Sequence, residues 1–424
     1  MKTVYVGMSG GVDSSLSAVL LKEAGYKVVG VYMKNWSRDL PGMKCPWAED
    51  LADAKRVAVK LGIDFKIFDF EKEYKQKVVD YMLSEFKKGR TPNPDIMCNQ
   101  EIKFKLFYET AREDGADLIA TGHYARVWND EVANLKGQGS PLAGAVEPHE
   151  GPALLKAVDE NKDQTYFLYR ISEEAIAHTL FPVGGMLKPD VKKLAAEKGL
   201  DNAYKKESMG VCFVGEVGME DFLKEYFPEK LGPIIDADTG ETVGTHTGAI
   251  FYALGQRKGL NLGGGLPYYV VKKDVSKNTI YVSRNLNFKD LWTDELTLED
   301  IVFRDCRNDM CSERAGNPRR AIRVMRAGPP GAELGVGAPS DDSWGSTQQD
   351  PNTPATAPWD AEGRRPTSQL ARKIKVRLRH RSELIPAELQ GGKLKFEKPV
   401  KRPASGQSAV FYRGDTCLGG GIVK

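Results

Sequence analysis

The segment most suggestive of chemistry is Ser9-Gly10-Gly11-Val12-Asp13-Ser14-Ser15, which follows a predicted strand and opens a predicted helix. Its glycines would let the backbone approach a phosphate at the positive end of the helix dipole, and its hydroxyls could donate to the phosphate oxygens. Asp13 could meet a bound metal ion or orient the phosphates through one. An ordinary glycine-rich turn with a serine cap is the alternative. The agreement of strand, loop and helix favours a phosphate site.

Two cysteines lie in loops that proline or glycine shapes. Cys98 follows Thr91-Pro92-Asn93-Pro94-Asp95 and comes just before a helix predicted to begin near Gln100, so the helix dipole would favour its thiolate. Cys212 lies in the glycine-containing run 207–213. A lone cysteine is more often a small buried hydrophobe, but two in such loops beside a phosphate loop favour a nucleophilic role. Asp95 could act as a general acid or base, or could merely cap the following turn.

Alternating apolar strands and amphipathic stretches in the first part of the chain predict an α/β domain with a parallel sheet. The predicted strands are 3–8, 27–33, 65–68 and 117–120, and the predicted helices are 14–23, 47–61, 73–86 and 100–113. These elements would place the phosphate loop and Cys98 in one domain, which we expect to span residues 1–216, with an insertion at about 134–152.

The remainder of the chain has a different texture. Helices are predicted at 189–198 and 220–226, and β segments at 249–253, 268–272, 279–283, 373–379 and 408–412, which suggest small antiparallel modules. We expect a small central domain over 217–288 and a C-terminal all-β, barrel-like domain over 289–424. Residues 307–372 are rich in Gly, Pro, Ser and Asp, and are predicted to be a disordered insertion.

Composition narrows the class of protein. Sixty-one Lys and Arg against 58 Asp and Glu give a net charge of +3, so a polyanion would have to meet a local basic patch. No apolar run reaches the ~18 residues that a membrane span needs, and no export signal precedes the first strand. Six scattered cysteines do not form a disulfide framework, which favours a reducing, cytoplasmic setting. Cys306 and Cys311 lack a second pair at metal-ligand spacing, so we predict no metal site in the protein itself.

The phosphate loop lacks the lysine of the GxxxxGK[ST] motif and instead resembles the SGGxDS signature of the PP-loop ATP pyrophosphatase superfamily. With further segments, the chain resembles the tRNA-specific 2-thiouridylase family over nearly its whole length, the two insertions apart. Those segments are 7–15, 32–36, 45–47, 89–95, 98–104, 120–126, 162–164, 210–213, 255–259 and 406–412. The resemblance implies a PP-loop domain of the adenine nucleotide alpha hydrolase type and a cytoplasmic enzyme that replaces the C2 oxygen of a wobble uridine with sulfur.

Carried over position by position, the resemblance also implies site residues. ATP, as its Mg²⁺ complex, would be held by Gly7, Met8, Ser9, Gly10, Gly11, Val12, Asp13, Ser14, Met33 and Gly122. Cys98 would be the nucleophile and Cys212 the persulfide carrier, with Asn93, Pro94 and Asp95 around the target base. The tRNA contacts would be His123, Lys162, Asp163, Gln164, Arg379, His380 and Gln407. A sulfur-relay protein or a cysteine desulfurase would donate the persulfide to a monomeric enzyme.

Several of these assignments have plainer alternatives. His123 could be a satisfied structural imidazole, and residues 162–164 could be a solvated helix start. The basic run Lys373, Lys375, Arg377, Arg379 and Arg381 alternates with other residues, which would put its charges on one strand face, either as a phosphate-contacting surface or as a soluble one. Glu207 and Met209 depart from the family's usual aspartate and glutamine near Cys212. The competing functions are another SGGxDS adenylating enzyme, which would not need the cysteines, and an RNA-binding protein without ATP turnover.

Overall fold

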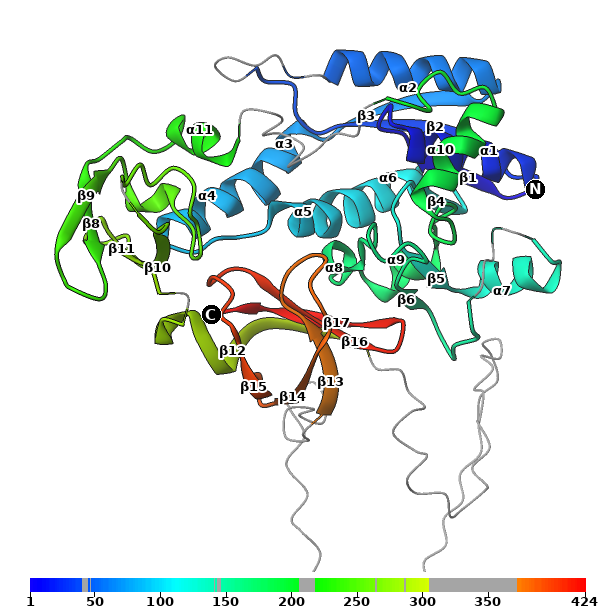
Figure 1. Cartoon of the computed structure of the whole chain (residues 1–424). Helices are drawn as coiled ribbons and strands as arrows, with labels where there is room; N and C mark the ends of the chain where they lie inside the picture. The colour runs from blue at the N-terminus through cyan, green and yellow to red at the C-terminus, as the bar shows by residue number, and fades with distance from the viewer. Residues whose placement is uncertain are drawn as a thin grey trace, which may run out of the picture. The chain divides into compact units, whose positions relative to one another are not determined.

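The N-terminal domain is built on a five-stranded parallel sheet. The computed structural model describes residues 1–39, 45, 47–140, 142, 146–205, 218–263, 265–285, 287–304 and 372–424. The sheet has the order β3-β2-β1-β4-β7, with bounds β1 Thr3–Gly7, β2 Lys27–Lys34, β3 Asp64–Asp69, β4 Leu118–Thr121 and β7 Thr179–Leu180. In β1, Val4 and Val6 are fully buried because neighbouring strands and helices cover the sheet (Figure 1). The predicted parallel α/β domain is confirmed.

The strand order reverses at β1, which pairs with β2 on one side and β4 on the other. In open parallel sheets, such a reversal leaves a crevice beyond the carboxyl ends of the two diverging strands. Gly7 at the end of β1 lies level with Val31 of β2 and Thr121 of β4. The phosphate loop therefore leaves the sheet at the position where this topology favours a ligand site.

Helices connect the strands of this domain. The first part of the chain contributes α1 Val12–Glu23, α2 Trp47–Leu61, α3 Glu71–Tyr74, the π-helix η1 Lys75–Val79, α4 Asp80–Lys87, α5 Pro94–Met97, the π-helix η2 Cys98–Leu106 and α6 Phe107–Glu113. The later ones are α7 Asp130–Gly137, α8 Thr165–Leu168, α9 Glu173–Ala177 and α10 Lys188–Glu197. The helical run α5-η2-α6 begins at Pro94, earlier than the predicted Gln100, because Asn93 caps it and proline suits a first helical position. Cys98 thus lies within the helical run rather than before it.

The central region holds helix α11 Met219–Lys224 and a four-stranded sheet of order β10-β11-β8-β9. Its strands are β8 Gly232–Asp236, β9 Thr242–His246, β10 Tyr269–Asp274 and β11 Thr279–Ser283. Two predictions here are wrong. The sheet is mixed, since β11 pairs with β8 in parallel, and the strand predicted at 249–253 is a short 3-10 helix, Ala249–Phe251. Its N–H at Ala249 donates to the Asn278 side chain, and Gly248 has a φ of 154°, so the chain turns instead of extending.

The C-terminal strands form a closed antiparallel β-barrel, as the sequence predicted. Its strands follow the order β12-β15-β14-β13-β16-β17, and a further β12–β17 pairing closes the ring. Their bounds are β12 Trp292–Phe303, β13 Arg372–Arg377, β14 Ile385–Gln390, β15 Lys393–Lys401, β16 Ser408–Arg413 and β17 Thr416–Val423, with a 3-10 turn at Lys289–Leu291. Val376, Leu394 and Phe411 are fully buried in its core. The insertion predicted at 307–372 lies almost entirely outside the described residues.

One pair of antiparallel strands links the barrel to the N-terminal domain. Strands β5 Arg126–Trp128 and β6 Ala153–Leu155 pair with each other, and β6 pairs with β17 of the barrel at Leu155 and Thr416.

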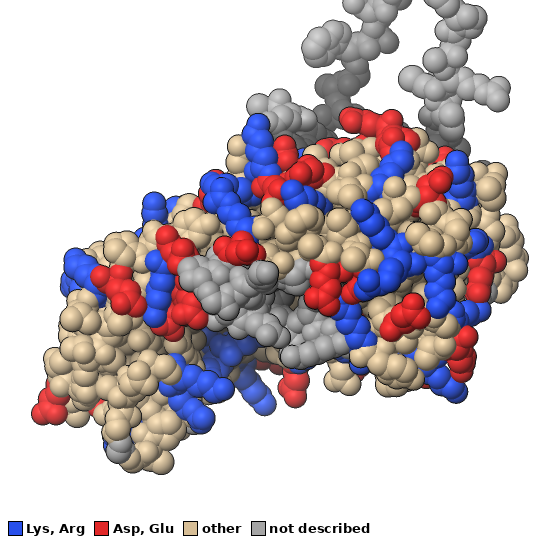
Figure 2. Space-filling view, turned by 90° about the horizontal axis from the view of Figure 1, so that it is seen from above, with Lys and Arg blue, Asp and Glu red and all other residues tan. Residues whose placement is uncertain are grey.

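Figure 2 shows Lys and Arg side chains lying among Asp and Glu over much of one face. In the described part of the chain, no helix is long and apolar enough to cross a membrane.

Candidate active site

A cavity of about 260 Å³ opens at the carboxyl ends of β1, β2 and β4. Every residue predicted to hold ATP lines it except Gly10 and Val12. The full lining is Gly7, Met8, Ser9, Gly11, Asp13, Ser14, Tyr32, Met33, Asn35, Asp50, Lys103, Thr121, Gly122, His123 and Gln164. Five lining residues were not predicted from the sequence, namely Tyr32, Asn35, Asp50, Lys103 and Thr121, although Asn35 follows the predicted second strand closely enough to have been a candidate.

The phosphate loop is shaped by its own hydroxyls. The Ser9 N–H donates to Ser14 Oγ at 3.2 Å, and the hydroxyls of Ser14 and Ser15 donate to the Gly11 carbonyl at 3.1 and 2.9 Å. Gly10 has a φ of +77°, and a Cβ there would lie 2.5 Å from the Asp50 carbonyl oxygen. This position accepts only glycine on both conformational and steric grounds.

Gly122 brings a second loop against the start of α1. A Cβ at Gly122 would lie 2.5 Å from the Ser14 nitrogen and 2.7 Å from the Asp13 carbonyl carbon. The loop that follows β4 therefore packs on the backbone of the phosphate loop. This contact explains how Gly122 and its neighbour His123 reach the same cavity.

The Asp13 carboxylate is paired with a lysine far away in the sequence. Lys188 Nζ lies 2.6 and 2.7 Å from the two Asp13 carboxylate oxygens, and the Tyr124 hydroxyl donates to Asp13 Oδ1 at 2.9 Å. Lys188 is only 6% exposed and is the first residue of helix α10. The backbone N–H of Lys188 donates to the Asp159 carboxylate, which fixes the start of the helix. No sequence pattern linked Lys188 to the phosphate loop.

Asp95 and Cys98 form a second group of reactive side chains. The Asn93 side chain accepts from the Asp95 N–H at 3.1 Å and so caps α5, and Cys98 at the end of α5 is 4% exposed. Burial raises the pKa of the Asp95 carboxyl, and the positive charge of Lys103 partly opposes that shift. Lys103 also lines the cavity, so it is the electrostatic link between the phosphate loop and Asp95.

Cys212 lies outside the described residues, as do Glu207 and Met209. Its predicted pairing with Cys98 therefore stays a prediction.

The side chains predicted to contact tRNA occupy different environments. His123 lies in the cavity between the rings of Phe104 and Phe181, and burial lowers its pKa well below the usual value. Gln164 also lines the cavity, where its side-chain oxygen accepts from the Tyr124 N–H at 2.8 Å. Lys162, two residues before Gln164 in the chain, is half-buried.

Asp163 is buried against the barrel rather than presented to solvent. It is 1% exposed, lies 2.6 Å from Arg377 Nη1, and accepts from the Thr165 hydroxyl at 2.9 Å. Arg377 is 8% exposed, so the expectation that the whole basic run lies on one open face is wrong at this residue. Its guanidinium turns inward because Asp163 supplies a buried counter-charge.

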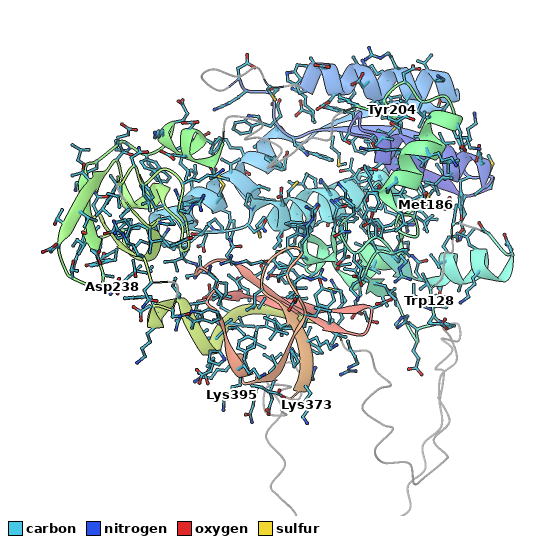
Figure 3. All side chains as sticks on the ribbon, viewed as in Figure 1. Trp128, Met186, Tyr204, Asp238, Lys373 and Lys395 are labelled. Carbon is cyan, nitrogen blue, oxygen red and sulfur yellow. The ribbon has the colours of Figure 1, made fainter. Side chains whose placement is uncertain are left out.

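Other members of the basic run remain open. Lys373, Lys375, Arg379 and Arg381 are exposed, and Figure 3 shows the side chains of Lys373 and Lys395 pointing outward from the barrel. The His380 ring packs against Phe167 with centroids 4.6 Å apart and planes tilted by 47°, and burial lowers the pKa of His380 to about 4. The side-chain amide of Gln407 donates to the Thr91 carbonyl at 2.6 Å.

Comparison with known proteins places this architecture in a family. The tRNA-specific 2-thiouridylase MnmA of Proteus mirabilis is 42% identical over 434 aligned residues, which cover 100% of this chain and 97% of that protein. The chain belongs to the tRNA-specific 2-thiouridylase family. The 2-thiouridylase of Levilactobacillus brevis is 39% identical, with 99% of this chain and 94% of that protein covered.

Family models match three stretches of this 2-thiouridylase family member. A tRNA methyl transferase HUP domain matches residues 2–216, a tRNA methyl transferase PRC-barrel domain matches 220–284, and an aminomethyltransferase β-barrel domain matches 359–423. A solved structure of a predicted tRNA methyltransferase subunit from Methanocaldococcus jannaschii has 17% identity and a TM-score of 0.27, covers 46% of this chain and 76% of its own, and is too distant to carry an argument.

Proposed function

We propose that this protein is an ATP-dependent tRNA 2-thiouridylase, which adenylates the C2 oxygen of a wobble uridine and replaces it with sulfur. One observation carries the proposal. The cavity lined by the phosphate loop is also lined by Lys103, which lies in the same π-helix, Cys98–Leu106, as the proposed nucleophile. One rigid element thus carries both a wall of the cavity and Cys98, which supports adenylation followed by sulfur transfer.

The lining of the cavity fits ATP. The hydroxyls and N–H groups at the start of α1 suit phosphate oxygens. The side-chain oxygen of Asn35 is buried on the cavity wall and has no hydrogen-bond partner within the described part of the chain. A buried acceptor without a partner is costly, and a donor such as the exocyclic amino group of adenine would satisfy it.

Mg²⁺ enters the proposal as part of the co-substrate. The two carboxylates that line the cavity are paired, Asp13 with Lys188 and Asp50 with Lys205. They do not present an open pair of carboxylates to a resident ion, whereas Mg²⁺ is commonly held by substrate phosphates with few protein ligands. We therefore derive no step from a metal site of the protein.

The two cysteines have different roles in the sulfur transfer. Attack of the uracil C2 oxygen on the α-phosphate of ATP releases pyrophosphate and makes AMP the leaving group. The terminal sulfur of a Cys212 persulfide then adds at C2 and AMP departs. The Cys98 thiolate next attacks the inner sulfur of Cys212, which breaks the sulfur–sulfur bond, leaves 2-thiouridine and forms a Cys98–Cys212 disulfide. An external thiol reductant must reduce that disulfide before the next turnover.

The remaining roles follow from their surroundings. Asp95, with Asn93 and Pro94, would face the target base, and burial raises the pKa of its carboxyl, which favours a role in proton transfer. A wobble base lies in a single-stranded loop, so it can enter such a pocket without breaking a duplex. Arg379 and His380 would contact the tRNA directly, and buried Asp163 would act by holding its neighbours. The monomeric state, the cytoplasmic location and the persulfide-donating partner stay predictions.

The test is mass spectrometry of nucleosides from unmodified tRNA incubated with the protein, Mg-ATP, a persulfide source and a thiol reductant. Exchange of one oxygen for sulfur at the wobble uridine should require ATP, Cys98 and Cys212, so Cys98→Ser and Cys212→Ser should abolish it. Cys45→Ser is the matched control, because Cys45 contacts the Trp36 carbonyl away from the cavity lining and should leave thiolation intact. AMP formation without thiolation would identify another adenylating enzyme, and neither product would identify an RNA-binding protein.

A further inference from the structure

The barrel holds the loop that carries the target-base residues. We call residues 91–95 the target-base loop. The Thr91 N–H donates to the Ser405 carbonyl at 2.7 Å, and the Gln407 side-chain amide donates to the Thr91 carbonyl at 2.6 Å. The turn that leads into β16 thus binds both backbone polar groups of Thr91.

Gly406 lies so close to Thr91 that a side chain at position 406 would press on the Thr91 backbone. Gly406 has a φ of +91°, and a Cβ on it would lie 3.0 Å from the Thr91 nitrogen and 3.1 Å from the Thr91 carbonyl carbon and oxygen. A second attachment lies beside it, because Arg90 forms ion pairs with Glu85 and with Glu299 of β12. The barrel therefore contacts this end of the loop at two places, the turn before β16 and strand β12.

The other end of the target-base loop is equally constrained. Asn93 caps α5, Pro94 occupies its first turn, and the helical run continues into η2 at Cys98. Asn99, next to Cys98, donates its side-chain amide to the Phe167 carbonyl at 3.1 Å. Little freedom is left between Thr91 and Cys98, so a displacement at Thr91 would be transmitted to Asp95 and Cys98.

We propose that Gln407 and Gly406 are positioning residues, which set the place of Asp95 and Cys98 by fixing Thr91. The inference rests on the proposed function. It gives Gln407 a role different from a direct tRNA contact, since its amide is engaged with the protein. The barrel then acts on the chemical step itself and not only on tRNA affinity.

The experiment compares Gln407→Glu and Gly406→Ala with the wild-type protein. Gln407→Glu keeps the shape of the side chain but loses the amide donor, and Gly406→Ala forces Thr91 aside. We expect the single-turnover thiolation rate at saturating tRNA and ATP to fall about tenfold or more, since small displacements of reacting groups are costly. The dissociation constant for tRNA should change less than about twofold. Alkylation of Cys98 by iodoacetamide, read by peptide mass spectrometry, should become faster than in the wild type.

Gly414→Ala is the matched control. Gly414 also has a positive φ, +56°, but a Cβ there would meet nothing within 4 Å, so the variant has the backbone strain without the contact. It should keep the wild-type rate. Weaker tRNA binding with an unchanged saturated rate would overturn the proposal in favour of a direct tRNA contact. An equal rise in alkylation at Cys417, which is 1% exposed in the barrel, would overturn it in favour of general loosening. Absence of thiolation by the wild-type protein would instead refute the proposed function.

Discussion

Paired charges organise the cavity at the scale of single residues. Asp13 would face the phosphates of a bound nucleotide as a negative charge if Lys188 did not lie against both of its oxygens. Lys103 lines the cavity, and its positive charge partly opposes the burial-induced rise in the pKa of Asp95 and adds to the burial-induced fall in the pKa of His123. Replacing Lys188 and replacing Lys103 should therefore affect different properties of the protein.

Lys188→Met should weaken both ATP binding and folding. It leaves the Asp13 carboxylate without its counter-ion, so the KM for ATP should rise about tenfold, equivalent to about 1.4 kcal/mol. We expect the free energy of unfolding to fall by about 2–3 kcal/mol, below the ~3–5 kcal/mol of a fully buried pair because the Asp13 side chain is 28% exposed. Steady-state kinetics and thermal denaturation measure the two effects.

Lys198→Met is the control at the other end of α10, where Lys198 is the C-cap residue. Lys198 pairs with Glu23 at the surface, with side chains 34% and 49% exposed, so both quantities should stay near wild type. Equal effects from the two variants would contradict the role assigned to Lys188.

Lys103→Met should move the acid limb of the thiolation pH profile to higher pH. Burial already raises the Asp95 pKa, and removing the nearby positive charge removes the opposing effect, so the pKa rises further. If the carboxylate form of Asp95 is the active one, activity is then lost at a higher pH as the solution is acidified. The profile of kcat against pH gives the shift.

Lys105→Met provides the comparison on the same helical run. Lys105 is exposed and interacts with Glu101, so its loss should leave the limb in place. If the acid limb of the pH profile also stays in place in Lys103→Met, then Asp95 does not determine the pH at which activity is lost.

At the scale of elements, one helix start carries both the target-base loop and the nucleophile. Asn93 and Pro94 begin the run earlier than apolar periodicity indicates, because capping and a proline at the first turn decide where a helix starts. The π-helix η2 then extends from Cys98 to Leu106 and contains Lys103. The position of the cysteine thus depends on a local cap.

Asn93→Ala should lose this cap at a cost of about 0.5–2 kcal/mol in the free energy of unfolding. Because the cap lies beside Asp95 and Cys98, the thiolation rate should fall about tenfold or more. Differential scanning fluorimetry and single-turnover assays measure the two effects.

Ser172→Ala removes an equivalent cap from α9, where the Ser172 hydroxyl oxygen accepts from the Ala175 N–H at 3.1 Å. It should lower stability by a similar amount and leave the rate unchanged. A matching loss of rate in both variants would mean that stability alone explains the effect.

At the scale of the whole molecule, the barrel is joined to the N-terminal domain by buried polar contacts as well as by strand pairing. Asp163 and Arg377 form a buried ion pair among these contacts, with side chains 1% and 10% exposed. The Thr165 hydroxyl lies 3.0 Å from the hydroxyl of Tyr412 in β16, which continues the network into the barrel. The catalytic half of the chain is therefore coupled to the barrel in stability.

Arg377→Met should destabilise the protein by about 3–5 kcal/mol, because it leaves Asp163 buried without a counter-charge. The double variant Asp163→Asn with Arg377→Met should recover part of that loss. Chemical denaturation of the wild type, Asp163→Asn, Arg377→Met and the double variant gives the coupling energy between the two side chains.

Lys393→Met serves as the surface comparison. Lys393 and Glu295 lie 2.8 Å apart on the outside of the barrel and are 53% and 36% exposed, so the loss should stay below about 1 kcal/mol. A similarly small loss in Arg377→Met would contradict the structural role of the buried pair.

The sequence by itself determined the features that depend on local chemistry. Strand and helix periodicity predicted the parallel sheet, and the Ser9–Ser15 motif predicted a loop that lines a cavity where the sheet order reverses. The family membership also followed from local motifs. Such features are encoded by neighbouring residues, so they can be read without knowing the fold.

Only the tertiary structure decided which distant residues meet. Lys188 pairs with Asp13, Asp163 turns inward to Arg377, and Gln407 reaches Thr91, although long stretches of chain separate the members of each pair. A side chain's role depends on whether folding gives it a counter-charge, a cavity or solvent, and residue type does not encode that choice. The same limit explains the 249–253 segment, where a contact with Asn278 and a turn at Gly248 replaced the expected strand.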